Sequence, residues 1–476
     1  MNIALPKIIQ GGMGAGVSGW RLAQAVSRLG QLGVVSGTGL AEVVARRLQD
    51  GDPGGHVRRA LAHFPFPQMA QRVMDGFFIS GGRAKNMPYK RIPMFEIHAR
   101  REPLELSIIG NFAEVFLARE GHAHPVGINY LEKMQLPHLS SIYGALLAGV
   151  SVVIMGAGIP LAVPHVLRTL ARHETATYPI SVVGADGKNE MVDMVFNPQD
   201  FIEGTLPPDL QVPYFFPIVS SDSLASILLK KASGPIDGFI VEGNLAGGHN
   251  APPRGRATFN EAGEPIYGKR DEARLSAFRE NGLPFWLAGS VGSPEGLRFA
   301  LEEGASGIQV GTAFALCAES GLLPEVRHQL ISKALNGQAE IVTDPRVSPT
   351  GFPFKVAHLD DSLSEESVYE NRARLCDLGF LRQPYRRKDG SLGYRCPAEP
   401  VAAYVAKGGA EEDTVGRKCL CNALIANVGM PQLLPDGSTE KCLITLGDDL
   451  LGVERFCKNG EVEFSAEEVV QVLLGS

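Results

Sequence analysis

Phe285-Trp286-Leu287-Ala288-Gly289-Ser290 and Gly307-Ile308-Gln309-Val310-Gly311-Thr312 decide the fold, because each apolar run ends in glycine and a hydroxyl residue. Between them, Ser293-Pro294-Glu295 has the cap, the early proline and the first-turn acid that favour a helix start. In a (β/α)8 barrel, the loops after strands seven and eight hold a phosphate beside a helix N-terminus. We therefore predict a phosphate site at Gly289, Ser290, Gly311 and Thr312.

A third glycine cluster, Gly11-Gly12-Met13-Gly14-Ala15-Gly16, follows the apolar run that ends at Ile9. Residues 14–19 also satisfy the G-x-G-x-x-G pattern of dinucleotide-binding folds. Those folds place an acid at the end of the second strand, where this chain has Ser36-Gly37-Thr38. We therefore interpret the cluster as a close approach of backbone to a ligand, not as a dinucleotide fingerprint.

Residues 215–322 alternate between short apolar runs and helical patterns. Strands are expected at 216–219, 238–241, 285–288 and 308–310, with helices at 224–231 and from Pro294. Such alternation predicts an α/β fold with a parallel sheet, closed as a TIM barrel or doubly wound, and the paired phosphate loops favour the barrel. We assign residues 1–40 and 106–355 to the barrel, 41–105 to an inserted helical segment, and 356–476 to a C-terminal extension or small lid domain. Strand character is expected to return over residues 106–130.

The composition is that of an ordinary globular protein, with 44% hydrophobic and 20% charged residues. A net charge of -7 argues against nucleic acid as a partner. The N-terminus lacks the basic and apolar regions of a signal peptide, so a cytoplasmic location is expected. The uncharged stretch 134–167 contains prolines and glycines and is interpreted as helices around a strand, not as a membrane span. No nucleophile elbow, zinc-protease motif or Walker loop is present.

Seven cysteines occur, and six of them lie after residue 375. A metal or iron–sulfur site and unligated thiols are both open interpretations. The absence of any Cys-x-x-Cys pair favours unligated thiols, and no metal ligand is predicted.

Five motifs together resemble the nitronate monooxygenase (2-nitropropane dioxygenase) family, and flavin-dependent enoyl-acyl carrier protein reductases share the pattern. The opening Pro6–Met13 is similar to the start of that family, and Gly127-Ile128-Asn129 to its flavin-contacting loop. Ala246-Gly247-Gly248-His249 looks like its active-site motif. Residues 287–291 and 307–314 resemble its two phosphate loops, in the same order.

The resemblance implies FMN at the carboxyl ends of the barrel strands. By this analogy the backbone approaches the isoalloxazine edge at Gly11, Gly12 and Met13. The Met13 side chain is expected to serve in packing and not in the chemistry. Asn129 contacts the ring, Gly247 and Gly248 let the chain pass beside it, and Gly289, Ser290, Gly311 and Thr312 hold the phosphate. Glu242 either bonds to the flavin or stabilises its turn. Ser290 departs from the family, which usually has a second glycine there, and residues 41–105 and those after 355 have no counterpart.

His249 is the predicted catalytic residue. An imidazole that titrates near neutrality suits abstraction of the acidic proton of a nitroalkane, after which the nitronate is oxidised through the flavin with O2. In the alternative, an NAD(P)H-dependent enoyl reductase, His249 orients the carbonyl of an acyl thioester. A third possibility is a flavin- or phosphate-binding protein without activity.

His122 and His124 are secondary pocket candidates, and Lys355 is interpreted as solvated. The oligomeric state is not predicted.

Overall fold

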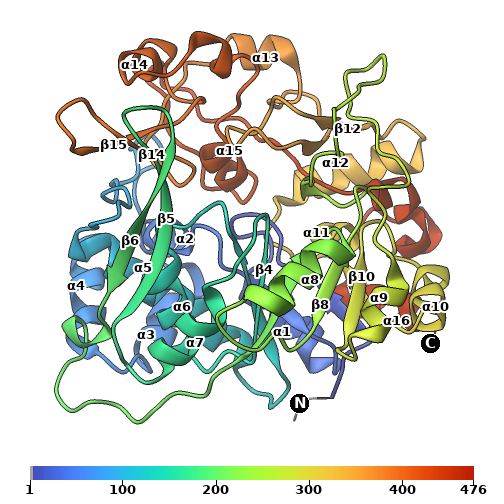
Figure 1. Ribbon diagram of the computed structural model, residues 1–476, viewed down its shortest axis with the longest axis horizontal. Helices are drawn as coiled ribbons and strands as arrows, with labels where there is room; N and C mark the ends of the chain where they lie inside the picture. Colours follow the sequence, from blue (N-terminus) through green and yellow to red (C-terminus); the bar gives the residue numbers. More distant parts are fainter. Residues whose placement is uncertain (1–3, 476) are drawn as a thin grey trace.

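A computed structural model describes residues 4–475 of the chain. Eight parallel strands form one sheet in the order β1-β11-β10-β8-β7-β4-β3-β2 (Figure 1). The two end strands meet where Ile9 bridges Leu32, so the sheet closes into a barrel. The predicted (β/α)8 fold is therefore confirmed. Its strands are β1 (Ile8–Gln10), β2 (Gly33–Ser36), β3 (Val126–Leu131), β4 (Val152–Gly156), β7 (Tyr214–Val219), β8 (Phe239–Glu242), β10 (Phe285–Ala288) and β11 (Gly307–Val310).

Large apolar side chains fill the interior of the barrel. Phe216 and Trp286 pack with their ring centroids 5.0 Å apart, and both are fully buried. The Trp286 indole donates to the backbone oxygen of Pro6 over 2.8 Å, so its one polar group is satisfied. Because this core is packed, no ligand fits inside the barrel, and the site is expected beyond the carboxyl ends of the strands.

Helices surround the barrel, and the last helix of the chain completes the ring. This helix, α16 (Ala466–Leu474), contacts both α1 and α10. The division of the chain into a barrel, an inserted segment and a C-terminal extension stays a proposal. We now assign α16 to the barrel instead of the extension. The other outer helices are α1 (Trp20–Arg28), α5 (Arg101–Arg119), α6 (His138–Leu147), α7 (Val163–Ala171), α8 (Asp222–Lys231), α9 (Leu275–Glu280) and α10 (Pro294–Glu302).

The expected strand character of residues 106–130 is wrong for residues 106–119, which belong to α5. Helices α1, α2 (Leu40–Gln49), α4 (Pro67–Phe77) and α6 all pack against α5. Nearly every side chain between Leu106 and Ala118 is buried. A helix buried on all sides has no polar face, so its sequence lacks the helical period that would distinguish it from a strand.

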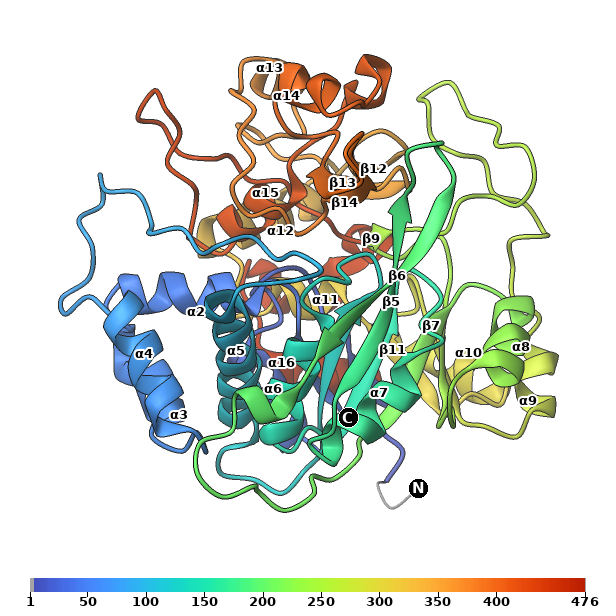
Figure 2. The same cartoon turned by 60° about the vertical axis from the view of Figure 1, so that its left-hand side comes forward.

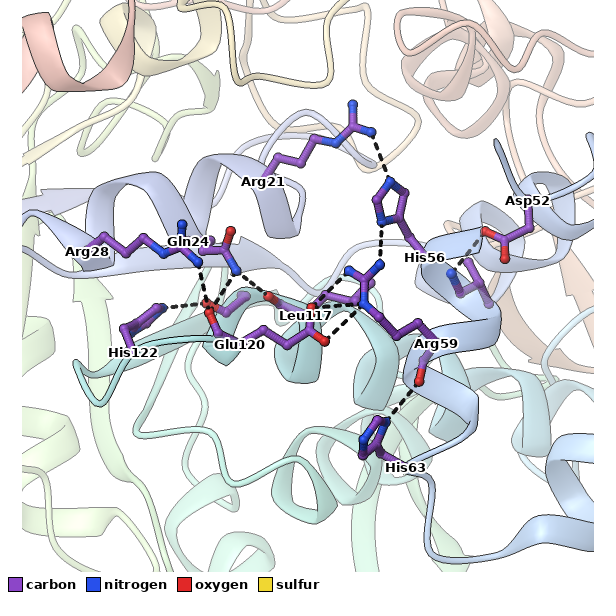
Figure 3. A network of polar contacts seen from close by, with 12 residues as sticks. Arg21, Gln24, Arg28, Asp52, His56, Arg59, His63, Leu117, Glu120 and His122 are labelled. Carbon is purple, nitrogen blue, oxygen red and sulfur yellow. Dashed lines mark hydrogen bonds and ion pairs between the residues drawn. The ribbon is translucent and has the colours of Figure 1, made fainter. Parts of the chain in front are cut away.

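Residues 40–77 form three helices that lie on the outside of α5 (Figure 2). They are α2 (Leu40–Gln49), α3 (His56–Leu61) and α4 (Pro67–Phe77). Figure 3 shows how α3 is attached: the Arg59 guanidinium pairs with Glu120, with Nη2 and Oε2 2.9 Å apart, and also contacts His56. Gln24 of α1 donates to the backbone oxygen of Glu120 over 3.0 Å.

Two smaller sheets stand beside the barrel. In one, β5 (Ala176–Val183) pairs with β6 (Asn189–Phe196) and with β14 (Gln383–Arg386), and β15 (Leu392–Arg395) pairs with β14. In the other, β13 (Phe354–Ala357) lies between β9 (Gly248–His249) and β12 (Ile341–Asp344). The remaining helices are α11 (Thr312–Leu316), α12 (Pro324–Leu335), α13 (Glu366–Glu370), α14 (Val401–Ala406) and α15 (Leu420–Ala426), with 3-10 turns at Pro53–Gly55, Pro198–Asp200, Glu411–Thr414, Asp448–Phe456 and Lys458–Gly460. No helix within residues 4–475 has the length and apolar character needed to cross a bilayer.

Candidate active site

A cavity of about 210 Å³ lies at the carboxyl ends of the barrel strands. The structure brings all twelve of the predicted site residues to its wall. They are Gly11, Gly12, Met13, Asn129, Glu242, Gly247, Gly248, His249, Gly289, Ser290, Gly311 and Thr312.

The first glycine loop is held against the end of β3. Asn129 Nδ2 donates to the backbone oxygen of Gly12 over 3.1 Å. A Cβ on Gly12 would lie 2.4 Å from Asn129 Cβ, so only glycine fits here. Ser18 Oγ donates to the oxygen of Gly11 and accepts from the N–H of Met13, both over 2.9 Å. These bonds hold the backbone of residues 11–13 in place at the cavity wall.

Two buried acceptors beside this loop have no hydrogen-bond partner among the described residues: Asn129 Oδ1 and Gln309 Oε1. Both residues line the cavity. Buried polar atoms in folded proteins are nearly always paired, so this pair of atoms indicates a ligand that donates hydrogen bonds. The sequence did not single out Gln309 as a site residue, since it lies within a predicted strand.

The loops after β10 and β11 form the predicted phosphate site, which we call the anion cradle after its expected ligand. Gly289 and Ser290 have φ of +95° and +56°, and a Cβ on Gly289 would lie 3.0 Å from the oxygen of Gly243. Within residues 4–475, the N–H groups of Ser290 and Gly311 donate to no acceptor. Converging free N–H groups near a helix N-terminus bind anions, which supports the predicted phosphate position.

A segment near the end of the chain, residues 445–449, covers this cradle. The N–H of Gly447 donates to Thr312 Oγ1 over 2.9 Å, and the N–H of Gly292 donates to Asp449 Oδ2 over 3.2 Å. Burial raises the pKa of the Asp449 carboxyl. A carboxylate therefore lies beside the loops that are expected to hold a phosphate, a feature that no motif indicated.

His249 is fixed by the three-stranded sheet. It pairs with Phe354 across β9 and β13, and the two ring centroids lie 4.9 Å apart. Its Nε2 lies 2.6 Å from Ser348 Oγ, which in turn lies 2.8 Å from Thr350 Oγ1. No described residue bonds to Nδ1.

The expectation that His249 titrates near neutrality is wrong. Burial, and secondly the positive charge of Lys133, lowers its pKa to about 3. Desolvation disfavours the charged form of a group, so the imidazole is neutral over the whole physiological range.

Glu242 ends β8 at the cavity wall. Burial raises the pKa of its carboxyl to about 7, so both of its protonation states are populated at neutral pH. None of the described residues forms an ion pair or hydrogen bond with this side chain. An unpaired, partly protonated carboxyl can both donate and accept a hydrogen bond to a ligand.

Two of the secondary expectations need correction. His122 lies at the end of α5, outside the cavity lining, where Nε2 contacts the oxygen of Ala118 over 2.7 Å (Figure 3). His124 does not line the cavity either. Lys355 is not solvated: it is 5% exposed, and its Nζ pairs with Asp448 Oδ1 over 2.8 Å.

Much of the opposite cavity wall is apolar and comes from the C-terminal third of the chain. Sequence reasoning missed it, because its residues are separated in sequence and match no motif. They are Phe354, Phe380, Leu381, Leu420, Cys421, Leu424, Ile425 and Leu446.

Comparison with known sequences supports the motif-based interpretation. Residues 213–346 match the family model described as nitronate monooxygenase. A curated nitronate monooxygenase from Pseudomonas aeruginosa is 37% identical over 129 residues, which are 27% of this chain and 34% of the relative. A (3aS,4S,5R,7aS)-5-hydroxy-7a-methyl-1-oxo-octahydro-1H-indene-4-carboxyl-CoA dehydrogenase from Mycobacterium tuberculosis is 29% identical over 157 residues, 33% of this chain and 39% of that protein. The chain thus spans less than half of either relative, and the resemblance is confirmed within the matched range.

Two solved structures align with nearly the whole chain at low identity. FabK from Thermotoga maritima has a TM-score of 0.48 and 16% identity, and the match covers 99% of this chain and 92% of FabK. Nitroalkane oxidase from Streptomyces ansochromogenes has a TM-score of 0.45 and 16% identity, over 99% of this chain and 95% of the oxidase.

Proposed function

We propose that this protein is an FMN-dependent oxidoreductase of the nitronate monooxygenase type, which oxidises alkyl nitronates with O2. The observation that carries the proposal is the convergence of all twelve predicted positions on one cavity. The match of residues 213–346 to the nitronate monooxygenase family supports it.

The residues present fit FMN at both of its ends. The free N–H groups of Ser290 and Gly311 suit the phosphate, and the unpaired Asn129 Oδ1 and Gln309 Oε1 suit the N–H donors of a flavin ring. Gly12 lets the backbone lie close to that ring. When bound, FMN would supply the redox chemistry by accepting electrons from the substrate.

A neutral His249 is better suited to hold a nitronate than to deprotonate a nitroalkane. A base with a pKa of about 3 is too weak to remove a carbon-bound proton readily. A nitronate has already lost that proton and carries negative charge on its oxygens. When the Ser348 hydroxyl donates to Nε2, the ring proton lies on Nδ1, which can then donate to a substrate oxygen.

The chain's other polar groups can assist in the same cavity. Glu242 can hold a proton at its carboxyl near neutral pH. The apolar wall of Phe354, Leu420 and Leu424 excludes water from the substrate. Exclusion of water strengthens the hydrogen bonds made inside the cavity.

A second candidate is a flavin enzyme that acts on an acyl thioester with NAD(P)H. One relative is named as a dehydrogenase of a carboxyl-CoA, which is an acyl thioester. A neutral imidazole that donates from Nδ1 can orient a thioester carbonyl as well as a nitronate.

Anaerobic reduction of the purified, FMN-loaded protein separates the two candidates. We expect an alkyl nitronate alone to bleach the flavin absorption, and O2 to restore it. Rapid bleaching by NADPH or NADH, with none by the nitronate, would instead support the thioester enzyme. His249→Ala should slow bleaching by the productive donor while FMN stays bound. Protein that takes up no FMN would contradict both candidates.

A further inference from the structure

Four of the seven cysteines come together in the C-terminal third of the chain. Cys376 lies between α13 and β14, Cys396 directly follows β15, and Cys419 and Cys421 lie at the start of α15. Figure 1 shows these elements on the same side of the molecule, above the barrel. Every pair among the four thiols is close enough to interact electrostatically. Cys396, Cys419 and Cys421 also pack in one cluster, and none of the four is in a disulfide.

A hydrogen-bond donor lies beside one sulfur atom of this four-cysteine cluster. Asn422 Nδ2 lies 3.6 Å from Cys419 Sγ. Donors of this kind stabilise thiolates and tune metal–thiolate centres, whereas neutral buried thiols do not need them.

Charged groups of both signs lie near the cluster. Arg372 lies near Cys419 and is paired with Glu440, while Arg382, Asp377 and Glu399 lie near Cys376.

We propose that Cys376, Cys396, Cys419 and Cys421 bind an iron–sulfur cluster. Four thiolates are the usual ligands of both [2Fe–2S] and [4Fe–4S] centres. This assignment replaces the interpretation of these residues as unligated thiols.

The spacing of the four sulfurs argues against a single zinc ion. Zinc at about 2.3 Å from four thiolates brings the sulfurs to roughly 4 Å from one another. Within residues 4–475, the only group of three or more potential ligand atoms all lying within 4.8 Å of one another is His358, Asp360 and Glu365. No three of the four sulfurs thus lie within 4.8 Å of one another, a wider spacing than one zinc ion requires and one compatible with a polynuclear centre.

The proposed centre lies beside the candidate active site. Cys421 itself lines the cavity, together with its neighbour Leu420 and with Leu381. A cluster at this position would share a wall with the bound cofactor. The inference does not depend on the identity of that cofactor, because all four ligands lie outside the anion cradle and the glycine loop.

The full-length protein, purified without oxygen, tests the proposal directly. Iron and acid-labile sulfide should be present in roughly equal amounts, and dithionite should bleach a broad visible absorption and produce a low-temperature EPR signal. If the purified protein contains little iron, it is incubated with Fe2+, sulfide and a thiol reductant, and the same measurements are then repeated. Protein that holds neither iron nor sulfide after this incubation would overturn the proposal, and so would stoichiometric zinc.

Substitutions identify the ligands. Cys396→Ser and Cys421→Ser should lose iron, sulfide and the EPR signal, whereas Cys442→Ser, at a partly buried cysteine outside the cluster, should retain all three. Equal iron in all three variants would overturn the assignment. If a ligand variant does not fold, mass spectrometry after alkylation of the native protein replaces it. Chelation of iron should then expose Cys376, Cys396, Cys419 and Cys421 to the reagent, and unchanged labelling of all four would count against the site.

Discussion

Asn129 donates from Nδ2 to the backbone oxygen of Gly12 over 3.1 Å, and its Oδ1 is left buried without a partner among the described residues. The two residues are distant in sequence, but Gly12 follows β1 and Asn129 lies within β3 of the same barrel. The same contact thus excludes any side chain from position 12 and leaves a buried acceptor beside the cavity.

Gly12→Ala should impair both folding and flavin binding. The new Cβ would meet Asn129 Cβ at 2.4 Å, and overpacking of this kind costs about 1–3 kcal/mol of unfolding free energy. Denaturant unfolding and FMN titration measure the two effects. Gly76→Ala in α4 is the control, since its Cβ meets only Lys90 Nζ at 3.9 Å. Equal behaviour of the two variants would contradict the packing argument.

Asp449→Asn should strengthen the binding of FMN but not that of riboflavin. The asparagine still accepts from the N–H of Gly292, while the negative charge near the phosphate is removed. We expect a roughly 2- to 10-fold lower Kd for FMN at pH 8, from about 0.5–1.5 kcal/mol of relieved repulsion. Fluorescence titration with both flavins measures it. An equal change for riboflavin would show that the phosphate does not lie in this cradle.

Ser348→Ala should lower kcat/KM by about 2- to 10-fold, because a hydrogen bond that orients a side chain is typically worth about 0.5–1.5 kcal/mol. The variant removes the hydroxyl that lies 2.6 Å from His249 Nε2. Nothing then fixes which of the two ring nitrogens carries the proton. His249→Ala should cost more, about 100-fold. Ser362→Ala removes a similarly buried hydroxyl, bonded to Ser364 Oγ over 2.8 Å and away from the cavity lining, and should leave the rate unchanged.

Glu242 should make the protein less stable as pH rises. Its carboxyl has a pKa of about 7 in the folded protein against an ordinary value of 4.5, so the folded state binds the proton more tightly. The stabilisation is fully present below pH 4.5 and is lost as pH rises through 7. Relative to Glu242→Gln, the ligand-free wild type should lose roughly 1–3 kcal/mol across this range. Urea unfolding at several pH values measures this loss of unfolding free energy. The control variant Glu261→Gln, at an exposed site, should lose as much stability as the wild type. No difference between Glu242→Gln and wild type would contradict the raised pKa.

Local sequence was enough to predict most strands and the positions of the site residues. Strand β10 begins and ends where the apolar run at 285–288 does, and the residues that follow it line the cavity. This prediction succeeds because parallel barrel strands all end at the same face. Any glycine loop that directly follows such a strand is therefore brought to the same place.

The long helix α5 and the packing of the final helix α16 could not be predicted from local sequence. The first is buried nearly all round and shows no amphipathic period, and the second packs against α1 only after more than 400 intervening residues. Partners that far apart leave no local signal in the chain.

The sequence by itself determined the barrel, the glycine loops and the presence of His249 beside them, because these depend on short runs of residues and on the direction of parallel strands. Tertiary structure alone decided that His249 is neutral, that Asp449 lies beside the anion cradle and that four distant cysteines become neighbours. Burial and spatial proximity set the charge state and the partners of a side chain, and both depend on segments that approach only when the chain folds.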